Sequence, residues 1–108
     1  MKMEIPHELK LAEAKARMKE LGEYWKAKYG VKPAWTKDSG NVKGSIMGFS
    51  FDATLIIAKD KVTLEGPDPN FLVKKKVLGY LEHKLNEYLD GDNSLEDLEA
   101  KREELAEG

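Results

Sequence analysis

The chain has 108 residues, 41% of them hydrophobic, which suits one domain with a single core. It contains no cysteine, and this excludes disulfides, thiolate zinc sites and cysteine nucleophiles. Residues 1–89 carry a net charge of +4 and residues 90–108 one of −6, so neither part has the concentrated positive charge of a nucleic-acid binder. No apolar run reaches the roughly 18 residues that a membrane span needs, and the charged, proline-containing start is unlike a signal peptide. We therefore expect a cytoplasmic protein.

The first part of the chain predicts a strand and then a helix. Residues 2–6 alternate between polar and apolar side chains, as in a short strand. The apolar spacing then changes to three and four, which predicts a helix with a stripe formed by Leu11, Ala14, Met18, Leu21, Trp25 and Tyr29. Its charged residues, including Arg17 and Glu20, are expected largely outside this stripe, and Gly30 suits a left-handed helix end. Gly22 costs about 1 kcal/mol relative to alanine inside a helix, so we expect close contact with a sheet there.

The middle of the chain returns to strict alternation. This pattern predicts four further strands over residues 34–38, 42–47, 49–58 and 61–66, with turns at residues 39–41 and 59–60. Connections this short make neighbouring strands antiparallel. In the last strand, Val62 and Leu64 are expected to face the core, and Thr63 is expected to face solvent.

A second long helix is predicted from Pro69 to residue 89. Asp68 is a favoured N-cap residue, and proline is favoured at the first helical position. At 100° per residue, the apolar face of this helix includes Phe71, and Lys74 falls at the centre of the same face.

The last segment predicts an acidic helix. Ser94 and Asp97 resemble a capping box that starts a helix reaching about residue 106. The whole pattern predicts an α+β fold, in which a four- to five-stranded antiparallel sheet carries two long helices on one face, in the order β-α-β-β-β-β-α, followed by this short acidic helix. We assign residues 1–89 to a single domain that folds alone, and residues 90–108 to an acidic helical extension. Docking of the extension onto its own domain and onto a partner subunit are both open.

Two motifs occur in the order of these elements. The first is Ile5-Pro6-His7-Glu8-Leu9, which continues to Glu13-Ala14 and Arg17. The second is Met47-Gly48-Phe49, followed by Val62-Thr63-Leu64-Glu65-Gly66 and the second long helix. Over about residues 3–89, the chain resembles in this order and spacing the polyhydroxyalkanoic acid system family, also called polyhydroxyalkanoate granule regulators. The resemblance implies a bacterial protein linked to storage-polyester metabolism, and it supplies no catalytic residues.

The two histidines are the first candidates for chemistry. His83 is predicted on the polar side of its helix. His7 follows the first strand, where it could bond the free amides of the first helical turn or a nearby carbonyl; a ligand contact is the alternative. The sequence has no metal-ligand spacing, no glycine-rich phosphate loop before a helix and no serine–histidine motif. We therefore predict no catalytic residue, no cofactor and no metal, and a protein that is not an enzyme.

The remaining candidates are one lysine and a set of aromatic residues. Lys74 either snorkels, with its stem on apolar surface and its amine in water, or places an ammonium at the mouth of an apolar groove. The spacing predicts that five aromatic side chains lie in the core: Trp25, Tyr29, Phe49, Phe51 and Phe71. A cavity between the sheet and the second long helix is the alternative, and in it Trp25, Phe51 and Phe71 would contact a ligand or a partner.

The function that these observations favour is that of a non-enzymatic accessory protein associated with polyhydroxyalkanoate granules or their regulation. It would act by surface binding, with the polyester granule or another protein as its partner. One alternative is a small carrier that holds an apolar carboxylate between the sheet and the second long helix. Another is an oligomerising interaction module, and the oligomeric state is open.

Overall fold

The computed structural model describes residues 1–46 and 48–107 of the chain. Its elements follow the order β-α-β-β-β-β-α-α that the sequence predicts. They are β1 (Lys2–Pro6), α1 (Leu11–Tyr29), β2 (Lys32–Trp35), β3 (Ser39–Ile46), β4 (Phe49–Ile57), β5 (Lys61–Glu65), α2 (Lys74–Leu89) and α3 (Leu95–Glu107). The last residue of the predicted strand 42–47, Met47, lies outside the described residues.

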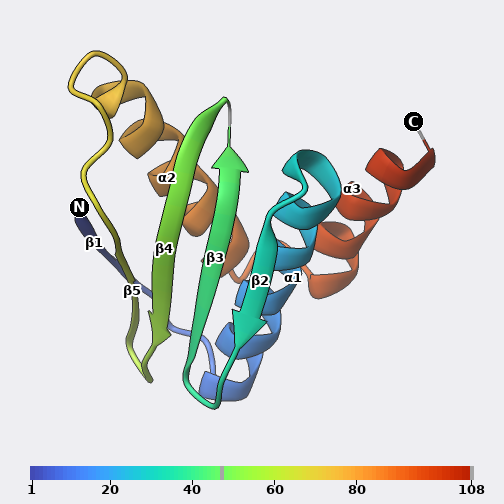
Figure 1. Cartoon of the computed structure of the whole chain (residues 1–108). Coiled ribbons are helices and arrows are strands. Elements are labelled where there is room, and N and C mark those ends of the chain that lie inside the picture. Colours follow the sequence, from blue (N-terminus) through green and yellow to red (C-terminus); the bar gives the residue numbers. More distant parts are fainter. Residues whose placement is uncertain (47, 108) are drawn as a thin grey trace.

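The five strands form one antiparallel sheet in the order β1-β5-β4-β3-β2. Helices α1 and α2 lie on the same face of this sheet, and α3 lies beside α1 (Figure 1). The core forms between the helices and the inward-facing strand residues, with Trp25, Leu55, Leu64, Leu85 and Tyr88 among its fully buried side chains. The predicted α+β class, with two long helices on one sheet face, is confirmed.

Helix α1 ends where the sequence predicts. Gly30 has a φ of 74° in the left-handed region, and its N–H donates to the carbonyl of Lys26 at 2.9 Å. Two charged residues that the spacing places largely outside the centre of the apolar stripe are nevertheless buried. Arg17 and Glu20 are both buried, because α3 and the segment before it cover the side of α1 that these residues occupy.

Glycines let α1 and β3 approach the indole of Trp35 from two sides. A Cβ on Gly22 would lie 3.0 Å from a ring carbon of Trp35 and 3.3 Å from the Cβ of Pro33. A Cβ on Gly40, which pairs with Trp35 in the sheet, would overlap the same ring. The close helix–sheet contact expected at Gly22 is therefore present, and β2 supplies it.

We expect Gly22→Leu to destabilise the fold by about 1–3 kcal/mol, which is typical of overpacking. Helix propensity alone would favour leucine by about 1 kcal/mol or less, so the sign of the change separates the two effects. Denaturant unfolding followed by circular dichroism measures the difference. A stabilised variant would contradict this expectation, because it would show that the ring of Trp35 can move to make room for the leucine side chain.

The strand boundaries differ from the prediction near the β2–β3 turn. Strand β2 ends at Trp35, and Ser39 and Gly40, predicted as a turn, already belong to β3. The tight connection lies earlier, where the N–H of Thr36 donates to the carbonyl of Ser39 at 2.8 Å. This register places the ring of Trp35 against Gly40, a position that any larger residue would block.

The side chain of Thr63 is buried, although alternation predicts that it faces solvent. Strand β5 is an inner strand, and Thr63 lies between its cross-strand neighbours Glu4 on β1 and Ile56 on β4. These longer side chains flank the short threonine, and this explains its burial.

Helix α2 begins five residues later than predicted, at Lys74 and not at Pro69. Asn70 forms a local turn instead of a helical start. Its side-chain Oδ1 accepts the N–H of Leu72 at 3.0 Å, and its carbonyl accepts the N–H of Val73 at 3.0 Å. Such side-chain bonds compete with helix formation for the same backbone amides.

Helix α3 docks onto its own domain. The predicted capping box is present, since the N–H of Asp97 donates to Oγ of Ser94 at 3.1 Å and the N–H of Ser94 contacts Oδ2 of Asp97 at 3.4 Å. Leu98 is fully buried in the core. Two ion pairs flank it, Arg102 with Glu20 at 2.7 Å and Lys101 with Glu87 at 2.6 Å.

The pKa of Glu87 reflects this docking. Burial alone would raise the pKa of this carboxyl, but hydrogen bonds from Lys101 and Lys84 outweigh burial and lower it below its ordinary value. The charged form of Glu87 is therefore favoured by the folded state. This contribution to stability is present above the ordinary carboxyl pKa and is lost as the pH falls through the lowered value.

We expect a chain truncated after Asn93 to unfold cooperatively but with about 2 kcal/mol or more less stability, because it loses the buried side chain of Leu98. A chain truncated after Leu89 is also expected to fold, since it keeps every strand and both long helices. It should be less stable than the longer fragment, because it also lacks carbonyls that bind Arg17. Thermal unfolding of both fragments tests this order, and loss of cooperativity in both would show that α3 is integral to the core.

Candidate functional site

The candidate site is an apolar groove where the sheet narrows. Strand β5 ends at Glu65, opposite Thr54, so within the described sheet residues 49–53 of β4 pair only with β3. Helix α2 begins only at Lys74. The segment between β5 and α2 crosses this gap and borders the groove, which has a volume of about 340 Å³.

Apolar side chains form most of the wall of this groove. It is lined by Met1, Phe49, Ser50, Phe51, Asp52, Pro67, Asp68, Pro69, Asn70, Val73, Val77, Tyr80 and Leu81. Phe51 reaches the core behind the groove, where its ring meets the buried ring of Trp25 with centroids 5.9 Å apart. The structure thus brings together two of the predicted contact residues, one in the wall and one behind it.

Tyr80 places a hydroxyl at the inner wall of the groove. Its oxygen accepts the indole N–H of Trp25 at 3.1 Å and contacts the hydroxyl of Tyr29 at 3.4 Å. Burial, with the hydrogen bond to Tyr29, raises the pKa of Tyr80 well above its ordinary value, so the phenol is neutral. The hydroxyl oxygen of Tyr80 therefore already has its hydrogen-bond partners within the protein.

Two large exposed apolar side chains lie between the groove residues Asn70 and Val73, and we call them the apolar tip. Phe71 is 83% exposed and Leu72 is 78% exposed. The prediction that Phe71 lies in the core is wrong, because Asn70 turns the chain before α2 and moves Phe71 off the helix. Phe49, also predicted in the core, is partly exposed and lies in the groove wall.

Lys74 is the first residue of α2 and does not lie one turn inside the helix, as a helix starting at Pro69 would place it. Its side chain is about half exposed, and its ammonium lies 3.8 Å from Oδ1 of Asp68. The α-amino group of Met1 lies 2.9 Å from the same oxygen. The hydrogen bond from that amino group, followed by the charge of Lys74, lowers the pKa of Asp68. Lys74 is not among the residues that line the groove.

His7 lies away from the apolar groove and makes two bonds to the backbone. The N–H of Leu9 donates to its Nδ1 at 3.1 Å, so the neutral ring carries its proton on Nε2, which lies 2.9 Å from the carbonyl of Ala58. Both ring nitrogens therefore fix the connection from β1 to α1. A second hollow, of about 630 Å³, borders His7, and it is lined mainly by polar residues and the loop after α2.

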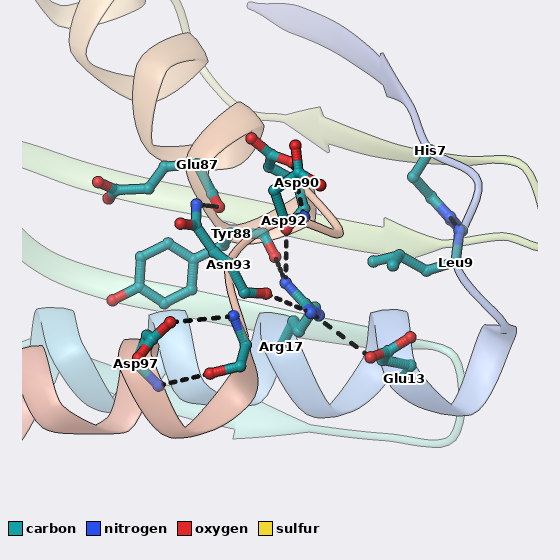
Figure 2. A network of polar contacts seen from close by, with 11 residues as sticks. His7, Leu9, Glu13, Arg17, Glu87, Tyr88, Asp90, Asp92, Asn93 and Asp97 are labelled. Atoms are coloured by element: carbon teal, nitrogen blue, oxygen red, sulfur yellow. Dashed lines mark hydrogen bonds and ion pairs between the residues drawn. The ribbon is translucent and has the colours of Figure 1, made fainter.

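Arg17 forms a polar network that the sequence pattern does not predict (Figure 2). Its guanidinium is buried and donates to three backbone carbonyls, those of Tyr88 at 3.1 Å, Asp90 at 3.0 Å and Asn93 at 2.6 Å. Its contact with Glu13 is longer, at 3.4 Å. The carbonyls of Tyr88 and Asp90 lie at the C-terminus of α2, where the helix dipole favours a cation, and that of Asn93 lies in the loop that follows. The signal in the sequence was Arg17 itself, four residues after Glu13.

The chain has the fold of a small α+β protein in which one sheet edge and one helix start form an open apolar groove. Residues 1–92 match a family model described as "Putative polyhydroxyalkanoic acid system protein". The chain belongs to this family, as the resemblance indicated. Searches of curated proteins and of solved structures found no match.

Two further observations concern the described residues. None of the helices they form is both long and apolar enough to cross a membrane. Within the same residues, no group of three or more histidine, aspartate or glutamate side chains is placed to hold a metal ion.

Proposed function

We propose that this protein is a non-enzymatic accessory protein of the polyhydroxyalkanoic acid system and that it acts by binding the surface of polyester granules. The membership of residues 1–92 in the family supports the link to this system. The apolar groove and the apolar tip supply a surface for an apolar partner. The observation that carries the proposal is the exposure of the consecutive residues Phe71 and Leu72, which lie in the chain between the groove residues Asn70 and Val73.

An ordered turn presents the apolar tip, and this supports a binding role. Asn70 holds the turn through its side chain and its carbonyl, so Phe71 and Leu72 project in a fixed backbone conformation. Two adjacent large apolar residues that face water gain roughly 1.5–3 kcal/mol each when an apolar body covers them. A polyester surface offers such a body, and the groove beside the tip can take side groups that project from it.

The test is a pull-down with granules that have been stripped of their own proteins, compared with silica particles of equal surface area. We expect the protein to be retained on the granules and to remain in solution with silica. Equal partition between the two kinds of particle would contradict the proposal, because retention would then require no polyester.

The rival function is a carrier for an apolar carboxylate, and the size of the groove favours it, since 340 Å³ lies within the range of small-ligand sites. The charges at the groove argue against an anionic ligand. Asp52 and Asp68 line it, and Lys74, the ammonium that the carrier needs, pairs with Asp68 outside the lining. A carboxylate in the groove would meet these two carboxylates, and the α-amino group of Met1, a lining residue, is already paired with Asp68.

We therefore expect no saturable binding of medium-chain acids by calorimetry, and no change in stability beyond about 0.5 kcal/mol for Lys74→Met, because its exposed pair contributes little. Saturable binding that falls roughly tenfold or more in Lys74→Met would instead support the carrier, since a charge-assisted bond has about this effect.

A further inference from the structure

The start of α2 combines three features that are each unfavourable for an isolated folded chain. The apolar tip is exposed. Val73 occupies the N-cap position and makes no side-chain capping bond, although serine, threonine, asparagine and aspartate are the favoured residues there. The first turn of α2 contains no acidic residue and begins with Lys74, Lys75 and Lys76, at the helix end where the dipole disfavours cations.

All three features become favourable together if an anionic, apolar surface covers this end of the molecule. We propose that the apolar tip and these three lysines, which we call the basic turn, form an anchor that inserts into the anionic amphiphile layer of a lipid-coated surface. This inference rests on the proposed function, because it uses the same apolar tip. It adds the chemistry of the layer that the protein meets.

The geometry of a helix end suits this contact. Successive helical residues rise only about 1.5 Å along the axis, so the three lysines form a ring at one level around the start of α2. They do not form a stripe along the helix side, because neighbours point about 100° apart. The apolar tip directly precedes this ring, and the segment lies at one end of the molecule, beyond the start of α2 (Figure 1). An end-on approach therefore inserts the tip and brings the lysines to headgroup level.

The distribution of charge also selects an anionic layer and one orientation. Lys75 and Lys76 are exposed, and neither takes part in an ion pair with any described side chain, whereas Lys74 pairs with Asp68. The chain as a whole has a net charge of −2, so an anionic surface attracts it only through a local positive region. The acidic helix α3 lies on the opposite side of the molecule from the basic turn (Figure 1), where an end-on approach keeps it away from the layer.

The test is sedimentation with two kinds of vesicle, one of phosphatidylcholine and one in which a third of it is replaced by phosphatidylglycerol. We expect wild-type protein to bind the anionic vesicles roughly tenfold or more tightly, since each lysine near an anionic surface adds about a fivefold gain. Salt at roughly 1 M should remove this preference, because it shortens the screening length to about 3 Å.

Two charge variants locate the effect. Lys75→Gln with Lys76→Gln should lower the affinity for anionic vesicles roughly 25-fold and leave binding to neutral vesicles unchanged. Lys19→Gln with Lys26→Gln removes the same charge from exposed positions on α1 and should change little. Equal weakening by the two pairs would overturn the proposal, since net charge and not the basic turn would then control binding.

The outcome is separable from that of the proposed function. Retention on bare polyester without any preference for anionic vesicles would overturn the anchor and leave the proposed function standing. Binding to anionic vesicles without retention on polyester would contradict the proposed function and leave the anchor standing.

Discussion

Replacing Arg17 by methionine is expected to destabilise the fold by about 3 kcal/mol or more. The guanidinium donates to the carbonyls of Tyr88, Asp90 and Asn93, and methionine keeps much of the bulk but none of the donors. Hydrogen bonds from a charged group contribute about 1.5–3 kcal/mol each, and a buried acceptor left without a donor costs about 1–3 kcal/mol. The loss of stability should exceed that of a single hydrogen bond, because all three carbonyls lose their donor together. Urea unfolding followed by tryptophan fluorescence measures it.

Two variants serve as controls for this effect. Lys19→Met removes a cation from an exposed site on the same helix and should change stability by less than about 0.5 kcal/mol. Arg17→Lys keeps the charge, but its single ammonium lacks the fork that reaches several carbonyls, so an intermediate loss is expected. If the free energy of unfolding of Arg17→Met lies within about 1 kcal/mol of the wild-type value, then water satisfies these carbonyls. The network would then not be a main source of stability.

Replacing both residues of the apolar tip, as Phe71→Ser with Leu72→Ser, should weaken binding to polyester particles roughly 100-fold or more. Covering each side chain contributes roughly 1.5–3 kcal/mol, and about 1.4 kcal/mol corresponds to a tenfold change in affinity. The fold should be unaffected, because both side chains project into solvent. Particle sedimentation at several protein concentrations gives the affinities, and thermal unfolding checks the fold.

The matched control for the tip is Leu11→Ser with Ile56→Thr. These residues are also exposed large apolar side chains, but they lie at the start of α1 and on β4, away from the groove. Their replacement should leave the affinity for the particles within about twofold of wild type, since each contributes little to a contact made at the tip. An equal loss in the two double variants would show that binding depends on general apolar exposure and has no defined site.

Much of the fold was predictable, because its signals are local and periodic. The strict alternation of polar and apolar residues predicted the four later strands, and Gly30 predicted the end of α1. The first residue of α2 was not predictable from helical spacing. In a turn and in a helix cap alike, a side-chain oxygen accepts a nearby backbone N–H, so the same residue types favour both. Asn70 takes the amide of Leu72 in a turn, whereas Asp68 and Pro69 suggested a cap.

The candidate site was only partly predictable. The aromatic pair Trp25 and Phe51 followed from apolar spacing, and the structure joins the two rings. The exposure of Phe71 did not follow, because the same spacing also fits a core position. The burial of Arg17 did not follow from its spacing to Glu13 either, because its main partners are backbone carbonyls of distant residues, which no side-chain pattern marks.

The central claim is that the apolar tip and the adjacent groove wall contact the polyester surface. Hydrogen–deuterium exchange of the wild-type protein, free and bound to polyester particles, tests this contact most directly. We predict that binding slows exchange in residues 49–52 and 70–77 and leaves α1, α3 and the β1–α1 connection unchanged. Protection centred on α1 or α3, with residues 70–77 exchanging as in the free protein, would contradict the account.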